Sequence, residues 1–266
     1  MPAEPVAVPA SGGAVRGLSV GEHKDSHTPG DIPGHVLSAF QLDGRAGVPL
    51  GPEWDNGVRF GRVVVARASA TAAWSGKVRE HAGEFGSGIA VSRPVRATDG
   101  RLVVGGFRAN EFVEGRVLSR IDETVAAALR YDEAAAGIEA PSADRGDVFA
   151  TAERAVWHGY TPQPDDVVAH VDFASCLLFS GDAVPTLTDL VPSSGLRPRG
   201  LSAALVIVDG LLAGLVDAAV LERWAHVPDL EALVRRALEY RAACAKAAGS
   251  DIRSKVELVE ALLVSE

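Results

Sequence analysis

Residues 170–190 read HVDFASCLLFSGDAVPTLTDL, and this stretch decides how the chain is interpreted. Asp172 and Asp189 each follow an apolar segment and stand 17 residues apart, so both carboxylates are expected at strand ends. Phosphoryl transfer needs one carboxylate beside the acceptor hydroxyl and another that holds Mg²⁺ on the nucleotide phosphates. The spacing permits both roles. It also permits two aspartates that only end strands and accept backbone hydrogen bonds in turns.

The composition is that of a globular chain with one large or two small domains. The 266 residues are 47% hydrophobic and 23% charged. The net charge of -9 disfavours binding to phosphate backbones, so no nucleic-acid partner is expected. Two cysteines, Cys176 and Cys244, cannot build a disulfide framework or a four-cysteine zinc site. A reducing compartment fits best, and we expect a cytoplasmic protein.

Several classes of enzyme, as well as exported and membrane-spanning proteins, are disfavoured by the motifs that the chain lacks. No P-loop, no G-x-G-x-x-G between a strand and a helix and no H-E-x-x-H is present. The G-x-S-x-G match at residues 17–21 lies in the aperiodic N-terminal stretch and does not follow an expected strand, so it does not predict a nucleophile elbow. Residues 1–10 are interrupted by prolines and carry Glu4, so no export signal is expected. Residues 201–221 are long enough to span a membrane, but Asp209 and Asp217 would each cost about 3 kcal/mol there. A buried core helix, and no membrane partner, is expected instead.

Hydrophobic patterning predicts strands and one helix before residue 111. Asn56-Gly57 and Asp99-Gly100 are pairs typical of tight hairpin turns. After a short helical segment at 32–42, the expected elements are strands at 46–50, 58–66, 89–95 and 102–107, with a helix at 68–84 between the second and third.

A connector near residues 111–115 separates this part from a mostly helical remainder. Asp229 and Asp251 are expected to cap helix N-termini. Helices are predicted at 117–136, 148–157, 202–221, 229–248 and 251–264, and strands at 167–173, 176–179 and 186–190.

In residues 170–190 the sequence resembles the aminoglycoside phosphotransferase and choline kinase branch of the protein-kinase-like fold. The resemblance extends from about residue 44 to the C-terminus. His170-Val171-Asp172 resembles the His-Gly-Asp triplet that opens the catalytic loop of that family, and Asp189 resembles its second metal-binding aspartate. More narrowly, residues 73–80, 93–101 and 122–123 are similar to an uncharacterised actinobacterial family of this type.

The resemblance implies an α+β fold with two lobes. A flexible arm is expected at 1–30, where Pro, Ala, Gly, Ser and His are mixed with scattered charge and show no periodicity. A small lobe with an antiparallel sheet and one helix is expected at 31–113. A larger, mainly helical lobe that carries the catalytic-loop-like hairpins is expected at 114–266.

The resemblance also implies a site for ATP and Mg²⁺. The adenine would lie at the connector, beside Glu111 and Val113, and Asp189 would hold Mg²⁺. Asp172 would accept the proton of a small-molecule hydroxyl as it attacks the γ-phosphate, and His170 would orient the loop.

The phosphate-pairing lysine of such kinases has no counterpart in this chain. The four lysines stand at 24, 77, 246 and 255, outside the strand at 63–67. Arg67 at the end of that strand, or Lys77 on the following helix, would have to substitute. Arg67 could pair with Glu80 on that helix, although a planar guanidinium group meets phosphates with a different geometry from the point charge of a lysine. Arg67 as a solvated surface arginine is the alternative.

The departures from the family pattern keep other functions open. Val171 replaces the motif glycine, and no asparagine lies between Asp172 and Asp189. A pseudokinase that binds a partner protein or a nucleotide without transfer therefore stands beside the small-molecule phosphotransferase, and a nucleotide-independent binding module is a third reading. Asp209 is expected to pair with Arg197 or Arg199, and Cys176 to be a small core residue.

Overall fold

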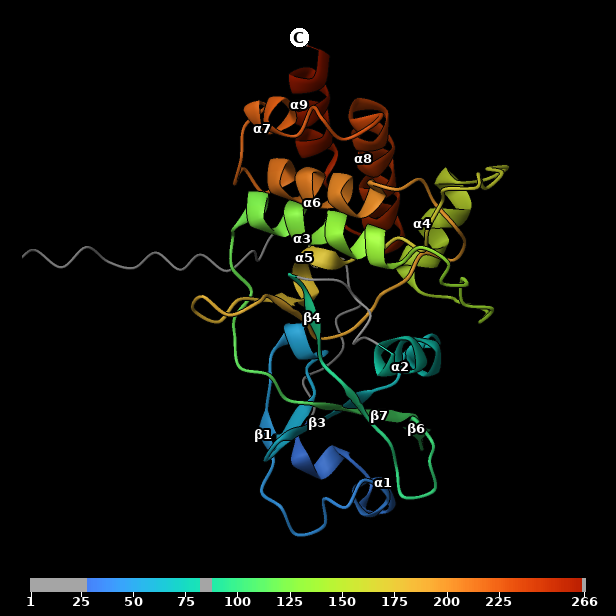
Figure 1. Cartoon of the computed structure of the whole chain (residues 1–266), viewed down its shortest axis with the longest axis vertical. Helices are drawn as coiled ribbons and strands as arrows, with labels where there is room; N and C mark the ends of the chain where they lie inside the picture. Colours follow the sequence, from blue (N-terminus) through green and yellow to red (C-terminus); the bar gives the residue numbers. More distant parts are fainter. Residues whose placement is uncertain (1–27, 82–87, 265–266) are drawn as a thin grey trace, which may run out of the picture.

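The computed structural model describes residues 28–81 and 88–264 (Figure 1). The predicted arm at 1–30 lies outside these residues except for its last three. Two bodies are stacked along the long axis, which we call the small lobe, built on a six-stranded sheet, and the large lobe, built mainly of helices (Figure 1).

The small lobe is a sheet covered on both faces. Its strands are β1 (Val48–Pro49), β2 (Val58–Phe60), β3 (Val63–Arg67), β7 (Phe107–Glu111) and β5 (Pro94–Val95) in that order, with β6 (Val103–Val104) also pairing with β7, all antiparallel. On one face, Val36 and Phe40 at helix α1 (Gly34–Ala39) pack on Val58 and Phe107. Helix α2 (Ala72–Glu80) lies on the other face (Figure 1). The predicted helix at 32–42 and the pairing of the first two strands are confirmed.

Three predicted strands are wrong because each conceals a change of direction. In the segment 102–107, Gly105 and Gly106, with left-handed φ values of 56° and 79°, turn the chain from β6 into β7. The segment 58–66 turns at Gly61, which has a left-handed φ of 65°, and becomes the hairpin β2–β3. The segment 89–95 splits into β4 (Ala90–Val91) and β5, which belong to different sheets. Strands of two or three residues are too short for a period of two to reveal their ends.

The second sheet joins the two lobes. Strand β4 pairs in parallel with β9 (Thr186–Leu187), and β9 pairs with β8 (Leu177–Leu178). A segment that follows α2 in the chain thus pairs with the strand that immediately precedes Asp189. This pairing fixes α2 relative to the predicted site.

The large lobe is organised around α6 (Leu201–Leu212), which is buried on nearly all sides, as expected for a helix that is apolar all round. Its neighbours α3 (Ile121–Ala134) and α8 (Leu230–Ala247) pack against it (Figure 1). The remaining helices are α4 (Val148–Val156), α5 (Phe173–Cys176), α7 (Ala219–Arg223) and α9 (Arg253–Val264), with short 3-10 helices η1 (Pro29–Asp31) and η2 (Pro52–Trp54) near the N-terminal end.

Three expectations for the large lobe are corrected. The helix at 202–221 is broken after α6, where Gly214 has a left-handed φ of 66°. Residues 167–173 form isolated bridges, Val167 with Arg197 and His170 with Pro192, and no continuous strand. Asp229 has a φ of 55° and makes no side-chain cap at α8.

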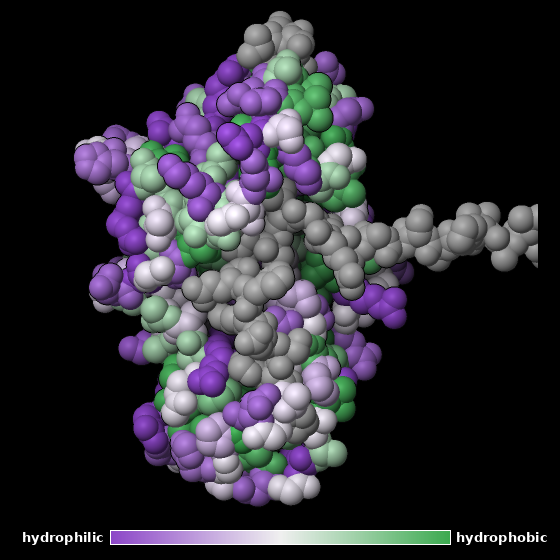
Figure 2. Space-filling view, turned by 180° about the vertical axis from the view of Figure 1, so that it is seen from behind, coloured by the Kyte–Doolittle hydropathy of each residue, from purple (hydrophilic) through white to green (hydrophobic). Residues whose placement is uncertain are grey.

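No helix in the described ranges is long and apolar enough to cross a membrane. Figure 2 shows hydrophilic and hydrophobic residues interspersed over both lobes on the face turned away from the view of Figure 1.

The loop between β1 and β2 is the part of the small lobe that differs most from expectation. A two-residue turn at Asn56-Gly57 was predicted. The observed connection, residues 51–57, contains η2 and places Asp55 and Asn56 at φ values of 52° and 51°. We call it the 51–57 loop.

Gly57 allows this loop to lie directly on β3, which gives a first prediction. A Cβ at Gly57 would stand 2.7 Å from the carbonyl oxygen of Val65, whereas a Cβ at Gly34 would meet nothing within 4 Å. Gly57→Ala should lower the free energy of unfolding by about 1–3 kcal/mol. Gly34→Ala should leave it unchanged or raise it by about 0.4–1 kcal/mol. Urea denaturation of both variants measures the difference, and equal effects would contradict the packing described here.

Candidate functional site

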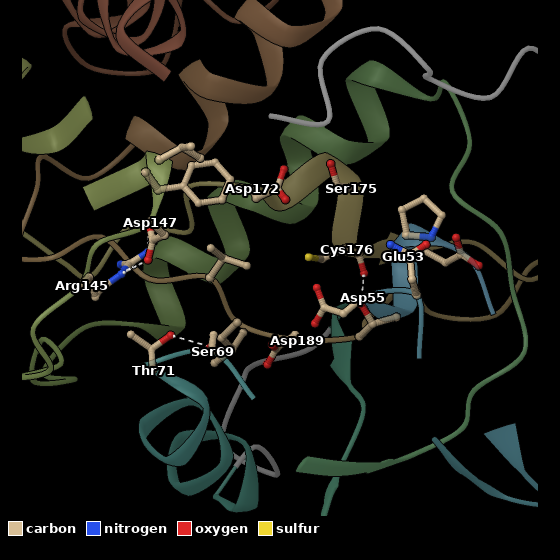
Figure 3. A pocket seen from close by; sticks show the side chains of 17 residues that line it. Glu53, Asp55, Ser69, Thr71, Arg145, Asp147, Asp172, Ser175, Cys176 and Asp189 are labelled. Carbon is tan, nitrogen blue, oxygen red and sulfur yellow. Dashed lines mark hydrogen bonds and ion pairs between the residues drawn. The ribbon is translucent and has the colours of Figure 1, made fainter. Parts of the chain in front are cut away.

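A cavity of about 130 Å³ lies between the lobes and contains both predicted aspartates. Figure 3 shows Asp172 and Ser175 on α5, Cys176 at the end of that helix, and Asp55 reaching in from the 51–57 loop. Ser69 and Thr71, just before α2, line the opposite side. We call this space the interlobe cavity.

His170 connects the two segments that carry the aspartates. Its Nδ1 accepts the backbone N–H of Asp172 at 3.3 Å, and its Nε2 donates to the carbonyl oxygen of Asp189 at 3.1 Å. This assignment is the neutral tautomer that satisfies both contacts. Burial lowers the pKa of His170 to about 4, so the ring is uncharged at neutral pH.

Asp172 is half-buried at the cavity wall. Burial raises its pKa to about 6, and the nearby Arg241 guanidinium opposes the shift. Arg241 also fixes the loop backbone, because its Nη1 donates to the carbonyl oxygen of Val171 at 2.9 Å. The structure therefore brings His170, Asp172 and Asp189 together, with Arg241 as a support that the sequence did not reveal.

Arg241 is also the partner of Asp209, which corrects an expectation. Its Nε and Nη2 bind the two carboxylate oxygens at 2.6 and 2.7 Å. Arg197, one of the predicted partners, pairs with Glu153 at 3.0 Å instead. An ion pair was expected for this buried carboxylate, but its partner lies on α8, which packs against α6 only in the folded chain.

Asp189 is held by two buried arginines. Its Oδ1 accepts the Ser75 hydroxyl at 2.6 Å and lies 3.2 Å from Nη2 of Arg79, while its Oδ2 lies 2.8 Å from Nη2 of Arg108. Burial alone would raise the pKa of Asp189, but attraction to Arg108 and Arg79 outweighs burial and lowers it. The carboxylate is ionised, and its charge is neutralised within the protein.

Arg79 is tied into the small lobe from α2. It donates to the carbonyl oxygen of Ser92 at 2.8 Å and to Oδ1 of Asn110 at 3.1 Å. Burial lowers the pKa of Arg79 to about 10, which still leaves it protonated at neutral pH. Arg79 directly precedes Glu80, the residue that the sequence suggested as the ion-pair partner of Arg67.

Arg108 projects from β7 towards the same carboxylate. It also forms an ion pair with Asp55 from the 51–57 loop. Burial opposes its charge, but Asp189 and Asp55 raise its pKa. Its Nε and Nη1 find no hydrogen-bond partner among the described residues, so the two carboxylates supply the compensation for its charge. The one feature of the sequence that could have indicated a buried role for Arg108 is its place between the apolar residues Phe107 and Ala109.

The expected Arg67–Glu80 pair does not form. Arg67 is exposed, and its guanidinium lies 4.6 Å from the centre of the Phe107 ring. Glu80 binds Arg96 at 2.5 and 2.6 Å. The arginine of the sheet that reaches Asp189 is Arg108 of β7. Strand β7 is the neighbour of β3, the strand that carries Arg67.

The connector residues lie apart from the interlobe cavity. Glu111 is exposed at the end of β7, and Val113 packs on a small apolar cluster of Trp54, Val64 and Leu178. Neither residue lines the cavity. Trp54 therefore lies in the same apolar cluster as Val113, one of the two residues beside which an adenine was expected.

ATP and Mg²⁺ do not fit these residues. Both oxygens of Asp189 are engaged by guanidinium groups, so a metal ion would have to displace buried ion pairs. Across the described ranges, no three carboxylate, imidazole or thiol groups are placed to hold a metal together. Phosphates would meet the carboxylates of Glu53 and Asp55 at the cavity.

The chain has a kinase-like α+β fold of two lobes, which confirms the predicted fold class. Among solved structures it is similar to an aminoglycoside phosphotransferase from Alicyclobacillus acidocaldarius, with a TM-score of 0.56 and 17% sequence identity over 91% of this chain and 93% of that one. At this identity the likeness concerns the fold. No family model and no curated protein matches the chain, and the narrower actinobacterial resemblance has no support.

The paired Asp189 gives a second prediction. Arg108→Gln leaves Asp189 and Asp55 short of a cation in a buried setting, so the free energy of unfolding should fall by about 3–5 kcal/mol. Arg67→Gln, at an exposed position, should change it by less than about 0.5 kcal/mol. Guanidinium denaturation provides the measurement, and a small effect at Arg108 would contradict the ion-pair network.

A buried carboxyl behind His170 gives a third prediction, on pH. Asp132 of α3 accepts the Ser202 hydroxyl at 2.5 Å, and the Ser202 oxygen accepts the backbone N–H of His170 at 2.9 Å. Burial raises the pKa of Asp132 from 3.8 to about 7. The unfolded chain therefore loses this proton first, so Asp132 contributes a downward slope to the free energy of unfolding, worth up to about 4 kcal/mol between about pH 4 and about pH 7. His170, whose pKa is lowered to about 4, contributes an upward slope over much of the same range, so the Asp132 contribution is read from the difference between wild type and variant.

Asp132→Asn should flatten that slope, because the amide keeps the shape and does not titrate. Unfolding at a series of pH values measures the slope in both proteins. Asp172, whose pKa is raised to about 6, adds a decrease that is smaller in total and complete at a lower pH, and that should persist in the variant. An unchanged slope in Asp132→Asn would contradict the assignment.

Proposed function

We propose that the chain is a catalytically inactive kinase-like scaffold. The observation that carries the proposal is the placement of Asp189 between Arg79 and Arg108. In active phosphotransferases of this fold the corresponding carboxylate holds the metal and a separate cation meets the phosphates. Here the carboxylate and the cations neutralise one another.

The energetic balance supports the proposal. Breaking a buried ion pair by removing one partner costs about 3–5 kcal/mol, and metal binding would have to compensate for such a loss. Arg79 and Arg108 are both almost fully buried, so water cannot replace the lost contacts. Mg²⁺ with ATP would thus compete against a satisfied network.

The competing function is phosphoryl transfer to a small-molecule hydroxyl. It is favoured by one observation, the presence of Asp172 at the cavity wall with a pKa raised to about 6. A carboxyl with such a pKa suits a general base. This function would require the Asp189 ion pairs to open first.

Thermal unfolding with ATP, with Mg²⁺ and with both discriminates the two functions, and this is the fourth prediction. Because a ligand at 100 times its Kd stabilises the native state by about 2.7 kcal/mol, millimolar nucleotide would reveal any Kd near 10 µM. We expect no rise in Tm and no ADP formation. A rise that needs both components and disappears in Asp189→Asn would contradict the proposal.

A further inference from the structure

We infer that the 51–57 loop is an internal ligand at the boundary between the lobes. The Trp54 indole lies beside the interlobe cavity in the position of a nucleotide base, and the Asp55 carboxylate lines the cavity in the position of a phosphate. The inference extends the proposed function by naming what occupies the nucleotide position. It can fail while that function stands.

Trp54 occupies a slot made by both lobes. Its side chain is only 4% exposed and packs with Val64 of β3 and Leu178 of β8. Its ring stacks on Phe112 of the connector, with centroids 5.5 Å apart and planes at 29°. A flat aromatic group held between apolar side chains of two lobes, against the connector, is the arrangement expected for a base in this fold.

Asp55 places an anion on the adjacent cation. Its carboxylate pairs with Arg108, whose guanidinium also holds Asp189. Figure 3 shows Asp55 close to Asp189 and to Cys176, with Glu53 beside it. The loop therefore presents an aromatic group followed by an anion, which is the chemical order of a nucleotide.

The backbone of the 51–57 loop is built to hold this pose. Hydrogen bonds from Asn56 N to Gly51 O at 3.0 Å and from Leu50 N to Gly57 O at 2.9 Å close the loop. Asp55 and Asn56 are consecutive non-glycine residues with left-handed φ values, a conformation that costs about 1–2 kcal/mol per residue. The contacts of Trp54 and Asp55 offset that strain.

Trp54 would exclude the base of a nucleotide and Asp55 would exclude its phosphates, so the two residues can be tested separately. A neutral nucleoside competes with Trp54 alone. ATP meets, in addition, the carboxylates of Asp55, Glu53 and Asp172 at the cavity. Removal of the indole should open the slot to adenosine before it opens the cleft to ATP.

The fifth prediction concerns Trp54→Ala, assayed by calorimetric titration and thermal unfolding with adenosine and with ATP. We expect at least a tenfold tighter Kd for adenosine than in the wild type, and no comparable gain for ATP. Trp54→Ala combined with Asp55→Asn should then also gain ATP binding, because Arg108 loses one carboxylate.

Trp157→Ala is the matched control. That indole is similarly buried, at 9% exposure, but lies at the end of α4 against Arg197 and Arg236. It should lower Tm without any gain in adenosine binding. If Trp54→Ala does not unfold cooperatively, Trp54→Leu keeps more of the apolar contact and carries the same expectation.

Two results would overturn the inference. One is a folded Trp54 variant that gains no affinity for adenosine, and the other is a wild-type protein that binds adenosine as tightly as the variant. Neither result bears on the absence of phosphoryl transfer, which the wild-type assay with ATP and Mg²⁺ tests on its own.

Discussion

The contact on which the rest of the structure depends is the Asp189 carboxylate between the guanidinium groups of Arg79 and Arg108. One partner comes from α2, one from β7, and the carboxylate follows β9, so the same ion pairs connect the helix and sheet of the small lobe to the large lobe. Buried charges are tolerated only when they are paired, and each of these three charges has at least one partner across the lobe boundary. These buried charges are therefore compensated only while the two lobes keep their relative position.

Around that contact, the predicted catalytic segment keeps a fixed backbone. His170 binds the main chain on both sides of the cavity, and Arg241 binds the carbonyl group of the residue between His170 and Asp172. None of these contacts requires a nucleotide. The segment thus has a structural reason to adopt its shape that is independent of catalysis.

The sequence predicted the order of elements and the segment that carries Asp172 and Asp189, because both follow from local apolar patterns. The pairing of Asp189 could not be predicted in this way: Ser75 and Asp189 are 114 residues apart, and Arg108 and Asp55 are 53 apart. The choice of Arg67 rested on strand position alone, and the neighbouring strand supplied the cation. The splitting of 58–66 and 89–95 was missed because very short strands carry no readable period.

The 51–57 loop and the arginine pair are best understood as one balanced unit. Asp55 and Asp189 contribute two negative charges, and Arg79 and Arg108 contribute two positive charges, so the buried cluster is neutral only while the loop is in place. A divalent metal ion added to this cluster would leave excess positive charge, and a phosphate added beside Asp55 would leave excess negative charge, in a setting where uncompensated charge is costly. On the inference made above, these charges would oppose a bound nucleotide in addition to the volume of the Trp54 side chain.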